Sequence, residues 1–479
     1  MDFESTHNLA YASVSELLDL YRKRQVSPVE MTELFIDRIG KLDGKLNAFL
    51  ELNFSQAREQ ALRAEANILR GDSERILEGI PITIKDLELT EGLRTTSGSL
   101  IYKDRIPVED SIVVERIRAS GAIIIGKSNT PEFGLLGETR NRLGDHCRNP
   151  WDISKTSGGS SGGAAAALIS GMCTIATGSD GGGSIRIPAS FTGTYGIKPS
   201  QGRVPRYPVL NPPISNQTSQ SGPMARSVYD CALLLQVMSG YDPRDVSSLR
   251  ADVPDFSSFA DAVNPKSISE LKIGWTPDFG YAKVDPEVLK ICETAVKSFS
   301  DIGCDVGNST FSIEDPFEHW MVLFSTMSLA SNSEHWPGRS EDMTDYANDI
   351  YDFGSSLSAA DFSRAIANVN SIRQALDNQF EKFDILISPT MAVPPYECGN
   401  PPLTIEGSEL DGSWGCLPFT YPINSAGNPA ASIPAGMTSE GLPVGLHIIG
   451  KYGDEETVIA ASAAFEAVNP WSHLRPEIS

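Results

Sequence analysis

Short apolar runs rich in β-branched residues alternate along most of the chain with stretches that carry helix patterns. This alternation is typical of α/β folds, because strands that helices cover on both faces form continuous apolar runs. We therefore predict a large mixed, partly parallel central sheet flanked by helices. The expected strands are Ile80–Ile84, Ala122–Ile125, Cys173–Thr177, Leu271–Trp275, Ile385–Ser388 and Leu446–Ile449.

The first 75 residues have a different, helical texture. Ser27-Pro28 is typical of a helix start. Gly71 is typical of a helix end and follows the helical pattern of Gln56–Arg70. By contrast, Arg203–Pro223 is rich in Pro, Ser and Asn, so we expect an irregular segment there.

No internal repeat or low-complexity linker interrupts the 479 residues. Length alone suggests about three domains, but we predict one domain because the motifs described below span the chain. We divide it into an N-terminal helical region (1–75), a catalytic core (76–225), a variable substrate-facing region (226–380) and a C-terminal part with core strands and a helix (381–479).

Charge and cysteine content exclude several classes of protein. The 62 acidic and 39 basic residues give a net charge of −23, which disfavours a nucleic-acid partner. The seven cysteines are scattered without a CxxC pair, so we expect free thiols, no disulfide framework and no metal site. The start is acidic and polar, and no run of 18 apolar residues occurs, so we expect a cytoplasmic protein without a membrane partner.

Two motifs match known patterns by letters alone. Gly121–Ser128 fits the P-loop pattern, but its middle residues Ala-Ile-Ile-Ile form strands and leave no loop to hold a phosphate. Gly158–Gly162 fits the nucleophile elbow G-x-S-x-G, which needs a histidine and an acid downstream. None of the six histidines has a recognisable triad setting, and His447 lies in an apolar run where we expect a buried, satisfied residue.

A third pattern links a lysine after an apolar strand, Lys85, to two Gly/Ser segments around residues 160 and 184. With these segments the chain resembles the amidase signature hydrolases, which use a Ser–cisSer–Lys triad. The resemblance rests on segments in the family's order: GIPITIKD, GAIIIGKSNTPEF, SGGSSGGAAAAL, GSDGGGSIRIPASFTGTYGIKPS, SGPMARSVYDCALLL, ILISPT, and PINSAGNPAASIPAG with GLPVGLHIIG.

The chemistry of amide hydrolysis explains the pattern. A serine hydroxyl needs a base, and a lysine is a base only as a free amine, which burial favours by lowering its pKa. Lys85 follows alternating isoleucines and fits such a buried site. The resemblance implies that Ser184 is the nucleophile and that Ser160, after a cis Gly159–Ser160 bond, relays the proton, with Ser161 as its neighbouring alternative.

The glycines before Ser184 lack side chains that would block close approach. We therefore expect the backbone N–H groups of Gly181, Gly182, Gly183 and Ser184 to form an oxyanion hole. The resemblance gives supporting roles to Ser179, a possible hydrogen-bond partner of Lys85, and to Asp180 and Arg186, expected to pair. For the substrate pocket we predict four aromatic residues, Trp320, Trp336, Trp414 and Phe419.

The resemblance implies an amidase that cleaves a C–N bond of a small-molecule amide through an acyl-serine and releases amine or ammonia. It implies no metal and no cofactor, and a homodimer is one assembly that we leave open. The alternative function is the glutaminase component, called the A subunit, of a tRNA-dependent amidotransferase. Those subunits usually carry an Arg-rich segment before the late strand, whereas Tyr351–Phe362 contains no arginine.

Overall fold

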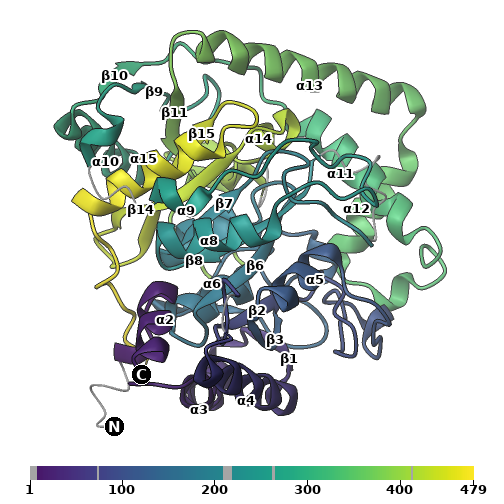
Figure 1. Cartoon of the computed structure of the whole chain (residues 1–479). Coiled ribbons are helices and arrows are strands. Elements are labelled where there is room, and N and C mark those ends of the chain that lie inside the picture. Colours follow the sequence, from purple (N-terminus) through teal and green to yellow (C-terminus); the bar gives the residue numbers. More distant parts are fainter. Residues whose placement is uncertain (1–7, 73–74, 209–217, 261–264, 411–413, 479) are drawn as a thin grey trace.

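The computed structural model describes residues 8–72, 75–208, 218–260, 265–410 and 414–478. Within these residues, eleven strands form one mixed sheet in the order β1-β3-β2-β6-β8-β7-β14-β15-β11-β9-β10 (Figure 1). The strands are β1 (Phe49–Leu52), β2 (Pro81–Lys85), β3 (Ile123–Ser128), β6 (Ile175–Asp180), β7 (Tyr195–Lys198), β8 (Gln220–Ala225), β9 (Lys272–Trp275), β10 (Asp305–Asn308), β11 (Ile385–Pro389), β14 (Ala430–Met437) and β15 (Pro443–Gly450). Two short pairs lie outside it, β4 (Arg148–Asn149) with β5 (Asp152–Thr156) and β12 (Thr404–Ile405) with β13 (Ser408–Glu409).

Helices surround this sheet. The α-helices are α2 (Val14–Arg22), α3 (Pro28–Leu46), α4 (Phe54–Arg70), α5 (Ile112–Ala119), α6 (Gly162–Ile169), α7 (Arg186–Thr192), α8 (Val228–Met238), α9 (Phe256–Ala260), α10 (Pro286–Ile302), α11 (Phe317–Asn332), α12 (Asp345–Ser356), α13 (Ala359–Phe380), α14 (Tyr421–Ala426) and α15 (Glu455–Val468). In Figure 1, α8, α9 and α15 cover one face of the sheet. Helices α6 and α7 pack on its other side, where their buried alanines and isoleucines join separate apolar clusters.

The predicted fold class is confirmed. Each of the six expected strands overlaps a strand of the large sheet, and the helix start at Ser27 has a capping box with Glu30. The P-loop match is strand β3, which confirms that no phosphate loop is present there. The irregular segment predicted for Arg203–Pro223 is wrong at its end, because Gln220–Ala225 forms strand β8 between β6 and β7. Residues 209–217 lie outside the described residues.

The parallel direction of β2 and β6 brings the candidate site residues to one edge of the sheet. β2 and β6 run parallel as neighbours, so their carboxyl ends reach the same edge of the sheet. Lys85 is the last residue of β2, and Ser179 and Asp180 end β6. Ser184 lies in the turn from β6 to α7, directly before Ile185, the N-cap of α7.

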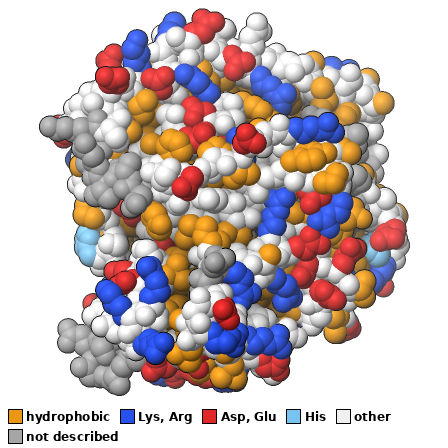
Figure 2. All heavy atoms as spheres, in the orientation of Figure 1, with side chains coloured by type: hydrophobic (Ala, Val, Ile, Leu, Met, Phe, Trp, Pro, Cys, Tyr) orange, Lys and Arg blue, Asp and Glu red, His pale blue; other side chains and the backbone are white. Residues whose placement is uncertain are grey.

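Acidic and basic side chains are interspersed on the face of the molecule shown in Figure 2. Among the residues described, no helix is both long and apolar enough to cross a membrane.

Candidate active site

Lys85 is fully buried at the carboxyl end of β2. Its Nζ lies 2.7 Å from Ser160 Oγ, 2.8 Å from Ser161 Oγ and 3.0 Å from Ser179 Oγ. Burial lowers the pKa of Lys85 to about 7, although the charges of Asp180 and Glu88 oppose this shift. At neutral pH the Lys85 amine is therefore neutral in a large fraction of the molecules, and a base must be neutral to accept a proton.

This pKa predicts the pH dependence of hydrolysis. Below pH 7 Lys85 gains a proton and cannot accept another, so kcat/KM should fall about tenfold for each pH unit well below this pKa and level off above it. The measurement is kcat/KM for a neutral amide between pH 5 and 9. A flat profile over this range would contradict the assignment of Lys85 as the base.

Two other lysines are fully buried on strands of the same sheet, Lys127 on β3 and Lys198 on β7. Burial lowers the pKa of Lys127 to about 8 and that of Lys198 to about 7. Lys127 donates to Thr90, Thr95 and a backbone carbonyl, and Lys198 to the carbonyl of Pro199. Their pKa values resemble that of Lys85, so geometry rather than pKa distinguishes the lysine that contacts the serines.

The Gly159–Ser160 peptide bond is cis, as the resemblance implies. A Cβ at Gly159 would lie 2.7 Å from backbone atoms of Glu138, so only glycine fits there. Ser160 lines the cavity that Ser184 also lines. Ser161 lies beside Ser179, and its Oγ accepts the Ser179 backbone N–H at 3.3 Å. Ser160 is therefore the better candidate for a contact with the nucleophile.

Asp180 and Arg186 form a fully buried ion pair at 2.9 Å, as the sequence predicts. Burial works against the charge of Asp180, but Arg186 outweighs it and keeps the pKa of this carboxyl below its usual value. The remaining Arg186 donors reach His447 Nε2 at 2.9 Å and Asn424 Oδ1 at 2.6 Å. His447 is therefore a buried, satisfied residue, as expected, and burial holds its pKa well below the usual value.

The glycine loop before Ser184 is held through its carbonyl groups. Trp320 Nε1 donates to the Gly181 carbonyl at 3.1 Å, and Thr420 Oγ1 donates to the Gly182 carbonyl at 2.6 Å. Gly183 has φ +128°, and a Cβ there would lie 2.4 Å from Thr420 Oγ1. These contacts fix the direction of the N–H groups in the loop.

One expected oxyanion donor is already engaged. The N–H of Gly183 donates to Asp180 Oδ1 at 2.7 Å, so the prediction that it binds the oxyanion is corrected. The backbone N–H groups of Gly181, Gly182 and Ser184 have no hydrogen-bond partner among the described residues. They remain the candidates for the oxyanion hole.

The Thr420 contact gives a testable prediction. Thr420→Val keeps the shape of the side chain but leaves the Gly182 carbonyl without this donor, so the loop loses its fixed direction. We expect kcat to fall about 5- to 20-fold with little change in KM. Ser425→Ala is the control, because the Ser425 hydroxyl donates to the Tyr421 carbonyl within α14 and to no other described residue. Equal kcat values for wild type and Thr420→Val would show that this hydrogen bond does not position the loop.

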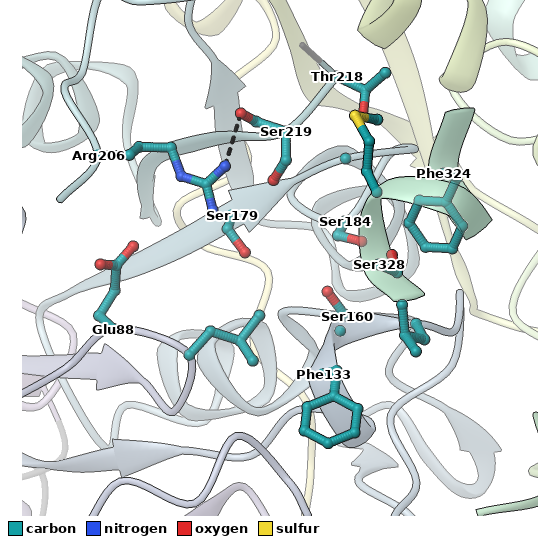
Figure 3. A pocket seen from close by; sticks show the side chains of 15 residues that line it. Glu88, Phe133, Ser160, Ser179, Ser184, Arg206, Thr218, Ser219, Phe324 and Ser328 are labelled. Atoms are coloured by element: carbon teal, nitrogen blue, oxygen red, sulfur yellow. Dashed lines mark hydrogen bonds between the residues drawn. The ribbon is translucent and has the colours of Figure 1, made fainter. Parts of the chain in front are cut away.

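An open cavity of about 90 Å³ lies beside Ser160, Ser179 and Ser184 (Figure 3). Phe133 and Phe324 line it on one side, and Arg206 and Glu88 on another. A smaller space, with room for about one water molecule, also reaches Ser184. It is lined by apolar side chains that include Trp320, Phe324, Trp414 and Leu417.

Two of the four predicted pocket aromatics, Trp320 and Trp414, line this smaller space. Phe419 does not, because it is fully buried and packs edge-to-face on Phe279 with ring centroids 5.1 Å apart. Trp336 packs against Tyr351 and lines neither space. The prediction is corrected for these two residues, whereas Arg206 was missed because no motif marks it.

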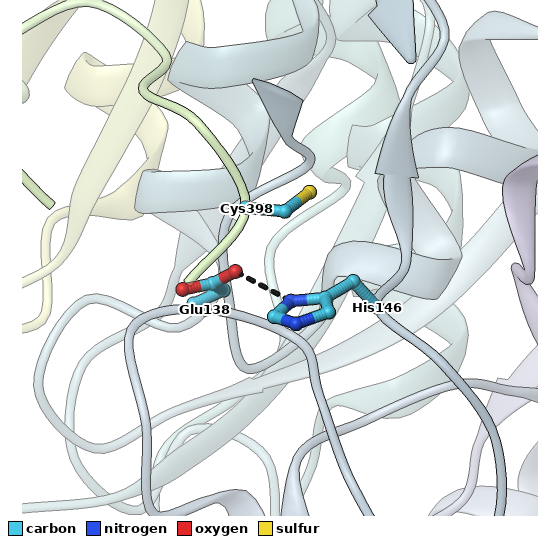
Figure 4. Close-up of side chains that lie close together, drawn as sticks. All are labelled: Glu138, His146 and Cys398. Carbon is cyan, nitrogen blue, oxygen red and sulfur yellow. Dashed lines mark hydrogen bonds and ion pairs between the residues drawn. The ribbon is translucent and has the colours of Figure 1, made fainter. Parts of the chain in front are cut away.

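A second cluster has residue types that bind metals. Glu138, His146 and Cys398 place one possible ligand atom each within 4.8 Å of one another (Figure 4). Zinc accepts such a donor set. However, Glu138 Oε1 already contacts His146 Nδ1 at 2.8 Å and accepts the Gly399 N–H, and burial raises the pKa of the Cys398 thiol to about 11. The cluster lies outside the cavity at Ser184, so we assign it no catalytic role.

Comparisons with known proteins agree with the fold and the site. Residues 30–459 match the family model described as Amidase. A protein named acylamidase from Rhodococcus erythropolis is 34% identical over 477 residues and 98% of each chain. The A subunit of glutamyl-tRNA(Gln) amidotransferase from Moorella thermoacetica is 35% identical over 497 residues, covering 98% of this chain and 99% of the relative. The solved structure of a bacterial aryl acylamidase has a TM-score of 0.89 at 33% identity and covers 96% of this chain and 97% of its own.

The fold and these relatives define the chain as an enzyme that hydrolyses C–N bonds of carboxylic amides. It belongs to the amidase signature family.

Proposed function

We propose that the chain hydrolyses small-molecule amides through an acyl-enzyme on Ser184, with Lys85 as base and Ser160 as relay. The observation that supports this most is the position of Lys85, a buried amine with a pKa of about 7 at 2.7 Å from Ser160 Oγ. Ser160 and Ser184 line one cavity, so a substrate carbonyl at Ser184 is also near the proton relay.

The proposed reaction has two halves. Ser184 Oγ attacks the amide carbon while its proton passes to Ser160 and the proton of Ser160 passes to Lys85. The N–H groups of Gly181, Gly182 and Ser184 stabilise the oxyanion. The intermediate collapses when Lys85 returns the proton through Ser160 to the leaving nitrogen, and water then cleaves the acyl ester by the same proton path.

The second candidate is the glutaminase subunit of a tRNA-dependent amidotransferase, which the identity to the Moorella thermoacetica protein favours. Two observations oppose it. The stretch Tyr351–Phe362, at the end of α12 and the start of α13, lacks the arginines that such subunits usually carry before the late strand. The net charge of −23 is unfavourable for a tRNA-bound assembly.

A substrate panel separates the two candidates. Purified protein is incubated with acyl anilides, aliphatic primary amides, cyclic amides, peptide amides and glutamine, and released amine or ammonia is measured. The proposal predicts turnover of one of the small amides well above that of glutamine. Turnover of glutamine alone would favour the amidotransferase function instead.

A further inference from the structure

The cavity beside Ser184 contains a cationic side chain that the proposed reaction does not use. Arg206 lines it together with Thr218 and Ser219 (Figure 3). Its Nη1 donates to the Ser219 carbonyl at 3.0 Å. Its Nε is buried and has no hydrogen-bond partner among the described residues. Of the five N–H groups of this guanidinium, one therefore has a partner within the described part of the chain.

The other arginine of the site differs in this respect. Arg186 is fully buried and uses Nε, Nη1 and Nη2 to bind Asp180, His447 and Asn424. Its donors are satisfied within the protein, so it holds the loop. Arg206 has the opposite arrangement, because its Nη2 has no partner among the described residues and can donate to a ligand.

Glu88 lies on the same side of the cavity but is not an acceptor for Arg206. Its Oε1 accepts the Ser221 hydroxyl at 2.6 Å, and its Oε2 accepts the Ser111 hydroxyl at 2.9 Å. Burial lowers the pKa of Arg206, and the nearby charges of Glu88 and Asp245 oppose this shift. Each carboxylate oxygen of Glu88 thus accepts one hydroxyl group, whereas only Nη1 of the Arg206 guanidinium has a partner among the described residues.

The two spaces at Ser184 differ in chemistry. The smaller one is lined by Trp320, Trp414 and Leu417 and has room for no more than about one water molecule. The larger one presents the Arg206 guanidinium, which is geometrically matched to a carboxylate because its fork forms two parallel hydrogen bonds. A substrate with its scissile amide at Ser184 can extend along the larger space toward Arg206.

We propose that Arg206 binds a carboxylate of the substrate, so that the enzyme prefers amides with an anionic group on one side of the scissile bond. This inference rests on the proposed function, since it needs the amide at Ser184. It assigns Arg206 as a residue that determines specificity.

The test compares substrates that differ only in charge. One series carries the carboxylate on the acyl side, as in ω-carboxyacyl anilides, and the other carries it on the amine side, as in N-acyl ω-amino acids of increasing spacer length. Each has a neutral partner of the same length that ends in methyl and a cationic partner that ends in an amine. For wild type, kcat/KM should be at least tenfold higher for the carboxylate form than for its neutral partner in one series.

The variant Arg206→Gln should lower the ratio of carboxylate to neutral kcat/KM by about 10- to 100-fold, because a charge-assisted, two-bond contact is lost. Arg206→Lys keeps the charge without the fork and should give an intermediate ratio. Arg364→Gln is the matched control, since Arg364 is an exposed residue of α13 that pairs with Asp361.

Two results would overturn the inference. One is a wild-type preference for neutral or cationic partners in both series, which needs no variant and so does not depend on its folding. The other is an equal loss of kcat/KM on charged and neutral substrates in a folded Arg206→Gln. Failure of the proposed function gives a different pattern, because wild type would then hydrolyse no amide in any series.

Discussion

Ser184→Ala is expected to lower kcat/KM for amide hydrolysis by about 10³- to 10⁶-fold, because no other group replaces the atom that forms the acyl bond. The variant should fold normally, since Ser184 is only partly buried and its side chain makes no hydrogen bond to a described residue. The measurement is single-turnover hydrolysis of an anilide, with thermal unfolding as the check on folding.

Ser425→Ala controls for the loss of a buried serine hydroxyl on the neighbouring helix α14. We expect its rate to stay within about threefold of wild type, because surface and helix hydroxyls of this kind contribute little to the site. If Ser184→Ala kept more than a tenth of the wild-type rate, the nucleophile would have to be another residue.

Lys85→Met is expected to lower kcat by about 10³-fold, since it removes the group that accepts and returns the proton. Methionine is chosen because it fills the buried space that alanine would leave empty. The hydrolysis that remains should also lose the rise in rate near pH 7, because the titrating amine is absent. Both quantities come from kcat measured between pH 5 and 9.

Lys198→Met makes the same change at a lysine that is also fully buried and whose pKa burial also lowers to about 7. Lys198 contacts a backbone carbonyl and no serine of the site. The loss of kcat should therefore be at most about tenfold and the pH profile should keep its shape. If Lys85→Met and Lys198→Met lowered kcat by a similar factor, the loss would reflect the removal of any buried lysine. Lys85 would then have no specific role in proton transfer.

Much of the fold follows from local patterns in the sequence. The β2 strand is marked by isoleucines at alternate positions and β3 by a run of three, and the helix starts and ends follow capping residues such as Ser27 and Gly71. Strand β8 was missed because its sequence, QSGPMA, lacks β-branched residues. Pairing with β6 and β7 on its two sides stabilises it, which no local pattern reports.

Some residues of the site could also be predicted from the sequence, and others could not. Motifs mark Lys85, Ser160 and Ser184 because the chemistry needs these residue types beside glycines. The pocket walls depend on which helices pack across the sheet edge, so Phe419 was assigned to the pocket although it packs in the core on Phe279. The bond from the Gly183 N–H to Asp180 depends on the exact turn of the loop and could not be read from three successive glycines. The prediction of one domain with four regions stays a proposal.

The most direct test of the account is to identify the residue that forms the covalent adduct. Wild-type protein is treated with a fluorophosphonate, digested and mapped by tandem mass spectrometry. The account predicts one adduct, on Ser184, with a labelling rate that rises with pH through about 7 as Lys85 loses its proton. An adduct on Ser160 or Ser161, or labelling of Ser184 that does not depend on pH, would contradict the proposed order of nucleophile, relay and base.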